Sequence, residues 1–139
     1  MSRSFSGGCA CGAVRYSCTA EPAYMGNCHC RDCQRATGSA YFAAVAIKEA
    51  DFNLDSGELG WFEKPADRGH TVKRAFCTGC GSPILLINGA NPDFRVLYAG
   101  SLDDPGIYQP MRDIYTASAQ PWDHLHPDIP KYDRHFTRK

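Results

Sequence analysis

The chain has no excess charge of either sign, because its 15 lysine and arginine residues balance 15 aspartate and glutamate residues. Proteins that bind nucleic acids or anionic membranes gather basic side chains on one surface, whereas here they are scattered, so neither partner is expected. No stretch approaches the roughly 20 apolar residues of a membrane span, and no apolar run near the start resembles a secretory signal. These absences favour a cytoplasmic protein.

Sequence repeats are also lacking. With 43% apolar residues over 139 positions, we expect a single domain over residues 1–139. Short segments rich in β-branched or aromatic residues, bounded by turn formers, predict a mainly-β, antiparallel fold. One helical turn is expected at 31–37, ended by Gly38. The predicted strands are 13–18, 41–47, 52–56, 59–63, 71–76, 84–87, 95–99 and 113–117.

Cysteine, in contrast, is abundant, with eight residues in the chain. Thiolates two or three residues apart converge readily on one metal ion, whereas such close neighbours are poorly placed for stable disulfides. Three tight groups have this spacing: Cys9 and Cys11; Cys28, Cys30 and Cys33; Cys77 and Cys80. The pattern indicates a zinc protein.

The three groups divide naturally into four thiols and three. A closed structural zinc site takes four protein ligands, whereas a reactive site keeps one position open. We therefore predict that the two pairs share one structural zinc and that the triplet holds a second zinc with room for an exchangeable ligand. Gly12 and Gly81 follow a cysteine at matching places in the two pairs. They support one shared site, although ordinary turn glycines are the alternative.

An even number of cysteines also permits a small disulfide-bonded secreted domain. The lack of a signal-like run, the adjacent pairing of the thiols and a length sufficient for a core all argue against it. The remaining cysteine, Cys18, lies in a segment that alternates like a strand. We expect it to be a small buried apolar side chain.

Three segments resemble the motifs of the glutathione-dependent formaldehyde-activating enzyme family, the Gfa or CENP-V/GFA domain proteins. They are GCACGAVRY at 8–16, CHCRDCQRATGS at 28–39 and RAFCTGCGS at 74–82. The resemblance implies an Mss4-like fold, in which antiparallel β-sheets surround a structural zinc site. It places that zinc on Cys9, Cys11, Cys77 and Cys80, and a second zinc at the catalytic triplet of Cys28, Cys30 and Cys33. It also implies a carbon–sulfur lyase that joins glutathione and formaldehyde into S-(hydroxymethyl)glutathione.

Arginines lie beside these motifs at positions 31, 35 and 74. Arg31, Arg35 and Arg74 are candidates for binding the carboxylates of a small acidic substrate. The alternative is that they only balance the negative charge of a thiolate cluster. Three thiolates on Zn²⁺ leave a weak Lewis acid, so holding an incoming thiol as thiolate is the favoured role of the open site.

Four other side chains, three of them within the motifs, are weaker candidates. His29 is expected beside the metal ligands or on the surface, since alternation turns it away from the ion. Thr37 and Ser39 either donate to a ligand sulfur or cap the helical turn. Trp122 lies in a loop-like segment and either lines a pocket or covers the core.

Two functions from different classes fit this sequence. The first is a zinc enzyme that acts on glutathione, or a similar thiol, and formaldehyde or another small aldehyde. The second is a non-catalytic zinc module that binds a small molecule or a protein partner. The state of the three-cysteine site distinguishes them.

Overall fold

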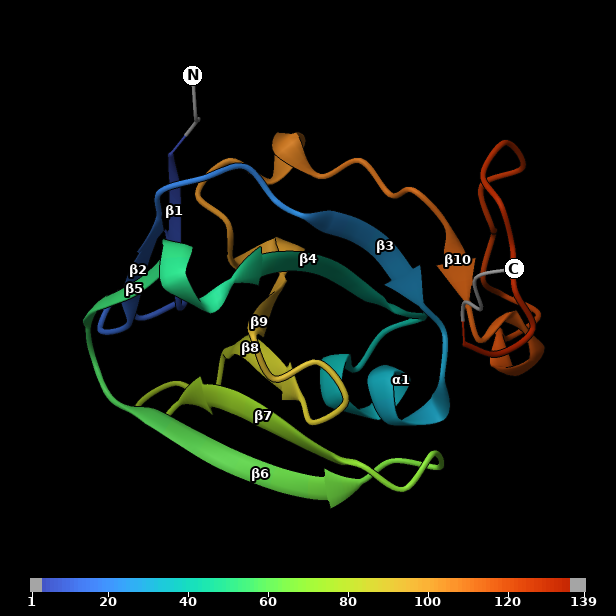
Figure 1. The fold of residues 1–139 in the computed structure, drawn as a ribbon, viewed down its shortest axis with the longest axis horizontal. Helices are drawn as coiled ribbons and strands as arrows, with labels where there is room; N and C mark the ends of the chain where they lie inside the picture. The colour runs from blue at the N-terminus through green and yellow to red at the C-terminus, as the bar shows by residue number, and fades with distance from the viewer. Residues whose placement is uncertain (1–3, 136–139) are drawn as a thin grey trace.

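The chain forms two β-sheets and one α-helix in a computed structural model that describes residues 4–135 (Figure 1). The smaller sheet has the order β1-β2-β5 and contains β1 (Phe5–Gly8), β2 (Arg15–Cys18) and β5 (Phe52–Ser56). The larger sheet has the order β10-β3-β4-β9-β8-β7-β6. Its strands are β3 (Tyr24–Cys28), β4 (Phe42–Lys48), β6 (Leu59–Pro65), β7 (Thr71–Cys77), β8 (Pro83–Asn88), β9 (Phe94–Tyr98) and β10 (Asp113–Ile114). Short 3₁₀-helices cover Glu49–Asp51, Ala99–Ser101, Pro105–Ile107 and Thr116–Ser118.

The mainly-β architecture predicted from the sequence is confirmed and is consistent with an Mss4-like fold. Two strands, β1 and β3, were not predicted, because each contains glycine, which lowers strand propensity. Close packing requires glycine at position 7, where a Cβ atom would collide with the Tyr16 side chain and with the Ser101 backbone oxygen.

The antiparallel prediction is wrong for one pair of strands, because β10 runs parallel to β3. The strand expected at 113–117 also ends after Ile114. Tyr115 has a φ of 57°, which is left-handed backbone that leaves the extended conformation. The chain then turns into the 3₁₀-helix Thr116–Ser118.

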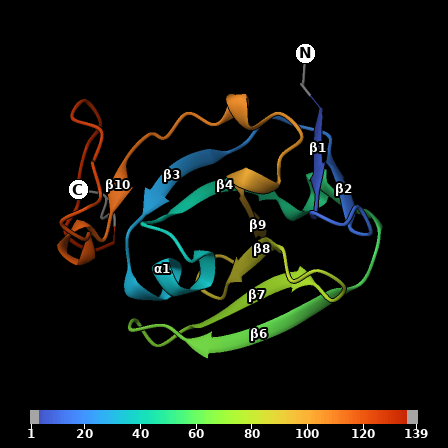
Figure 2. The ribbon, with the colours of Figure 1, turned by 180° about the vertical axis from the view of Figure 1, so that it is seen from behind.

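The two faces of the larger sheet have different roles. One face packs against the smaller sheet and forms the main core, which includes Tyr16 and Cys18 from β2 and Val45, Leu85 and Leu97 from the larger sheet. Cys18 is fully buried there, as predicted. At the opposite end of the molecule from the smaller sheet lie β10 and the C-terminal segment (Figures 1 and 2).

The other face of the larger sheet holds helix α1 (Arg31–Thr37), whose bounds match the prediction. The helix lies between β3 and β4 on one side and β6 and β7 on the other (Figures 1 and 2). The Cys30 thiol accepts a hydrogen bond from the Cys33 N–H at 3.3 Å and so caps the first turn of α1. Gly38, with a φ of 66°, closes its end. Among the described residues, no helix is long and apolar enough to cross a membrane.

Candidate functional site

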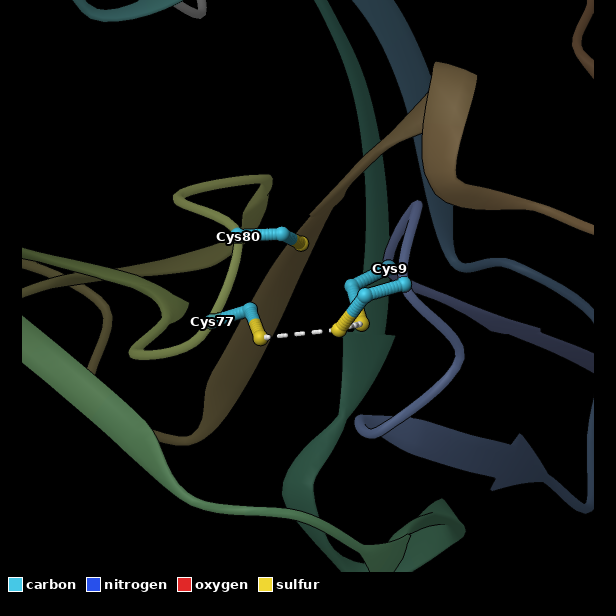
Figure 3. Close-up of side chains that lie close together, drawn as sticks. Cys9, Cys77 and Cys80 are labelled. Carbon is cyan, nitrogen blue, oxygen red and sulfur yellow. Dashed lines mark hydrogen bonds between the residues drawn. The ribbon is translucent and has the colours of Figure 1, made fainter.

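The two outer cysteine pairs meet in space. Cys9 and Cys11 lie in the turn between β1 and β2, whereas Cys77 ends β7 and Cys80 lies in the turn before β8. In Figure 3 the sulfur atoms of Cys9, Cys77 and Cys80 point toward one another from these two sides. The four sulfur atoms all lie within 4.8 Å of one another. This four-cysteine cluster therefore joins the β1–β2 turn to β7 and β8.

The spacing of the sulfur atoms fits a tetrahedral zinc ion. With Zn–S bonds of about 2.3 Å, the edges of a tetrahedron of sulfurs are about 3.8 Å long. The Sγ atoms of Cys9 and Cys11 are 3.5 Å apart, and those of Cys11 and Cys77 are 3.8 Å apart. All eight cysteines are free thiols, so the disulfide alternative is wrong.

A glycine with left-handed backbone closes both turns of the four-cysteine cluster, although its bond reaches back three residues in the first turn and four in the second. Gly12 has a φ of 82° and donates its N–H to the Cys9 carbonyl. Gly81 has a φ of 77° and donates its N–H to the Cys77 carbonyl. Left-handed backbone of this kind favours glycine. The two glycines noted in the sequence therefore each close one turn around the same cluster.

At two of the four sulfur atoms, those of Cys9 and Cys80, hydrogen bonds favour the thiolate form that binds metals. The Val14 N–H lies 3.2 Å from the Cys9 sulfur and lowers the pKa of that thiol. Hydrogen bonds from Ser82, whose hydroxyl lies 3.1 Å from the Cys80 sulfur, lower the pKa of Cys80 to about 5. Since metal ligation requires deprotonated cysteine, these contacts prepare the cluster for a cation.

The three-cysteine cluster forms where β3 runs into α1. Cys28 ends β3, Cys30 caps the helix and Cys33 lies in its first turn. Their sulfur atoms also lie within 4.8 Å of one another. Hydrogen bonds from the Cys28 and Cys33 thiols hold the pKa of Cys30 well below its usual range. Three converging sulfurs with a stabilised thiolate fit a cation that keeps one position open.

Cys18 belongs to neither cluster. Its side chain lies in the main core, and burial raises the pKa of its thiol to about 12. A thiol held in its protonated form among apolar neighbours is chemically inert. The structure thus separates one packing cysteine from seven that can bind metals.

A cavity of about 630 Å³ opens beside the three-cysteine cluster. Cys28, Cys30 and Cys33 all line it, whereas none of the four-cysteine cluster does among the described residues. The remaining lining contains apolar side chains from the sheet and charged side chains. The cationic residues outnumber the acidic ones, which are Asp32 and Asp67. The cationic residues are Arg31, Lys64, Arg68, Arg74, Arg112 and Arg134.

The three arginines singled out in the sequence lie in different environments. Arg74 lines the cavity, and its Nη2 donates to the Cys33 sulfur at 3.6 Å. Its position matches the charge-balancing alternative. Arg31 is exposed, lines the cavity and donates to the Gln34 side chain. Arg35 is exposed and does not line the cavity.

A buried polar network, which the sequence did not predict, supports the three-cysteine loop from behind. The His29 side chain is 1% exposed, with Nδ1 2.7 Å from Asp123 Oδ2 and Nε2 2.7 Å from Asp113 Oδ1. Each ring nitrogen thus has a carboxylate partner, so neither is available to a metal. His29 thus lies beside the ligands, and the alternative of a surface position is wrong. The only sequence signal for Asp113 was an acidic residue inside a predicted strand.

Comparison with known proteins places this chain in a family. A sequence model described as "Glutathione-dependent formaldehyde-activating enzyme" matches residues 4–118. The chain belongs to this family. A solved structure of a Rhodobacter sphaeroides protein shares the fold with a TM-score of 0.59 and 19% identity, covering 91% of this chain and 98% of that chain. A search of curated proteins found no match.

Membership of the glutathione-dependent formaldehyde-activating enzyme family agrees with the position of the cysteine clusters, since both lie within the matched residues. Other predicted candidates lie away from the sulfur atoms. The Thr37 hydroxyl donates to the Cys33 carbonyl at 2.8 Å, and Ser39 donates to Thr37 and to the Tyr41 carbonyl. Thr37 therefore bonds the end of α1, and Ser39 contacts Thr37 from the loop that follows. Trp122 is 62% exposed and does not line the cavity, so neither role expected for it is correct.

Replacing Asp113 by alanine is expected to destabilise the protein by about 2–5 kcal/mol, because it leaves two buried polar atoms, His29 Nε2 and Asn27 Nδ2, without their partner. Asp113 accepts from His29 and, at 3.0 Å, from the Asn27 amide, and its side chain is 1% exposed. Urea unfolding followed by circular dichroism measures the change. The exposed Asp133 is the matched control, and Asp133→Ala should shift the free energy of unfolding by less than about 0.5 kcal/mol. Equal stability of the two variants would contradict a supporting role for the network.

Proposed function

We propose that the protein is a zinc-dependent carbon–sulfur lyase that joins glutathione, or a similar thiol, to formaldehyde or another small aldehyde. The observation that carries this proposal is the contrast between the two clusters. The three-cysteine cluster opens to a cavity of about 630 Å³ and leaves one position of a tetrahedral zinc free, whereas the four-cysteine cluster, of which Cys9 lines a second cavity of about 590 Å³, already supplies four sulfurs. One cluster is thus suited to hold the fold together and the other to meet a substrate.

In this proposal Cys28, Cys30 and Cys33 are the catalytic metal ligands. A zinc ion bound there supplies a position at which an incoming thiol is held as thiolate. Cys9, Cys11, Cys77 and Cys80 hold the structural zinc. The Arg74 guanidinium, 3.6 Å from the Cys33 sulfur, offsets the negative charge that three thiolates bring to the site.

The chemistry of the reaction matches the cavity. Addition forms a bond between the thiol sulfur and the aldehyde carbon, and the aldehyde oxygen takes a proton to become a hydroxyl. Glutathione carries carboxylates, and the cavity has a surplus of cationic side chains, including Arg31 and Lys64. Arg35 has no part in this recognition, because it lies away from the cavity. We further propose a cytoplasmic location, since free thiols suit a reducing compartment.

Zinc analysis combined with a turnover assay tests this proposal. Protein purified under reducing conditions without added metal is expected to hold about two zinc ions per chain, one for each cluster. It should also accelerate the loss of free thiol when glutathione and formaldehyde are mixed. About one zinc per chain, with no turnover even after zinc is added, would instead favour the non-catalytic binding module.

A further inference from the structure

We infer that the aldehyde part of the substrate carries an apolar chain of several carbons, an inference that rests on the proposed function. Formaldehyde has a single carbon and gains little from an apolar wall. The cavity nevertheless has one, built from the face of the larger sheet opposite the main core. The substrate best matched to the whole cavity is therefore the adduct of an anionic thiol with an apolar aldehyde.

The apolar wall is a continuous row across adjacent strands. Ala46 on β4 pairs with Val96 on β9, and Val96 pairs with Leu86 on β8. Paired residues on neighbouring strands point to the same face of a sheet, and all three line the cavity. Val72 on β7 and Phe94 on β9 extend the wall, and both line the cavity as well.

This row begins at the reactive sulfurs. Phe42 pairs with Cys28 across β4 and β3, and alternation then brings Ala44 and Ala46 to the same face as Phe42. The other end of the row returns toward the sulfurs, because Leu86 pairs with Arg74, whose guanidinium contacts the Cys33 sulfur. A chain attached to the reacting carbon therefore has an apolar wall beside it that borders the cysteines at both ends.

The size of the wall argues against a purely structural role. Helix α1 covers the Cys33 end, where Phe42 is 3% exposed, but Val72, Phe94 and Val96 remain only partly buried. Alanine at positions 44 and 46 leaves open the space that larger side chains would fill. A volume of about 630 Å³ lies in the range of roughly 300–1,000 Å³ of pockets that enclose drug-sized ligands.

The polar part of the lining suits the thiol carrier. Lys64 and Arg68 lie at the β6–β7 hairpin, and Lys64 also forms a 2.6 Å ion pair with Asp32. Arg134 comes from the C-terminal segment. Cations bind the carboxylates of a peptide thiol, whereas the apolar wall excludes them. The cationic lining thus suits the thiol half of the adduct, and the apolar wall suits the aldehyde half.

Binding of S-alkylglutathiones to the zinc-loaded protein tests this inference without requiring turnover. Isothermal titration calorimetry would compare S-methyl-, S-butyl- and S-hexylglutathione. Each methylene that enters an apolar site should raise the affinity about fourfold. We expect S-hexylglutathione to bind at least tenfold more tightly than S-methylglutathione. An affinity that is flat, or falls, along this series overturns the inference.

A variant that narrows the wall gives a second measurement. Ala46→Leu should reduce the gain in affinity from S-methyl- to S-hexylglutathione by at least tenfold, because the larger side chain occupies the path of the alkyl group. Ala50→Leu, the same change on an exposed 3₁₀-helix, should leave the gain unaltered. If Ala46→Leu fails to fold, the series on the unaltered protein still decides.

Turnover assays on the same samples separate this inference from the proposed function. Turnover of glutathione and formaldehyde with a flat binding series would remove the apolar substrate and leave the lyase proposal standing. An affinity that rises with alkyl length, without turnover of formaldehyde or hexanal, would contradict the lyase proposal. It would still support an apolar thiol adduct as the ligand. Neither binding nor turnover would overturn both.

Discussion

Cys77→Ala is expected to leave the chain largely unfolded at 25 °C. Structural zinc in small domains contributes about 10–16 kcal/mol to folding, which matches or exceeds the roughly 5–15 kcal/mol of net stability of a typical domain. Cys77 is 2% exposed, and its sulfur lies 3.8 Å from that of Cys11. Its loss removes one ligand and opens the link between β7 and the β1–β2 turn.

Far-UV circular dichroism and thermal unfolding of Cys77→Ala measure this effect. The matched control is Cys18→Ala, which changes a buried cysteine that belongs to neither cluster. This control should remain folded, with a loss of about 1 kcal/mol from the smaller side chain. A Cys77→Ala protein with a normal cooperative transition and a full complement of zinc would show that the four-cysteine cluster is not the structural site.

Cys30→Ser is expected to have the opposite profile, with activity lost and the fold retained. Residues that only orient metal ligands already change affinity or activity by about 10–100-fold, so loss of a ligand should lower turnover more than about a hundredfold. Serine is chosen because Cys30 also caps α1 by accepting the Cys33 N–H. A serine hydroxyl makes the same cap, so the helix is preserved while the thiolate is removed.

Elemental analysis, turnover and thermal unfolding of Cys30→Ser would be measured together. Zinc should fall by about one ion per chain, while the melting curve stays near that of the unaltered protein. Cys18→Ala again serves as the control and should keep both zinc ions and its turnover. Full turnover of glutathione and formaldehyde by Cys30→Ser would remove the catalytic assignment of the triplet.

Features encoded by neighbouring residues could be predicted from the sequence. The helix at Arg31–Thr37 is defined by its own cap residues, Cys30 and Gly38. The division of the cysteines also follows from local spacing together with the preference of zinc for four ligands. The long strands β6 and β7 begin where predicted, because their β-branched and aromatic residues dominate locally.

Features that depend on long-range packing could not be predicted. His29 contacts Asp113 across 84 positions and Asp123 across 94, and nothing local links these residues. The cavity is a further case, because its wall combines side chains from four strands whose register the sequence does not specify. Strand β3 was missed because Gly26 weakens the strand pattern.

The four-cysteine cluster also has a topological consequence. Cys11 and Cys77 are separated by 66 positions, and Cys28, Cys30 and Cys33 lie in the segment between them. Bringing the two pairs together thus closes a long loop that contains the three-cysteine cluster. A zinc ion at the four-cysteine cluster would therefore fasten both ends of the segment that carries the other cluster.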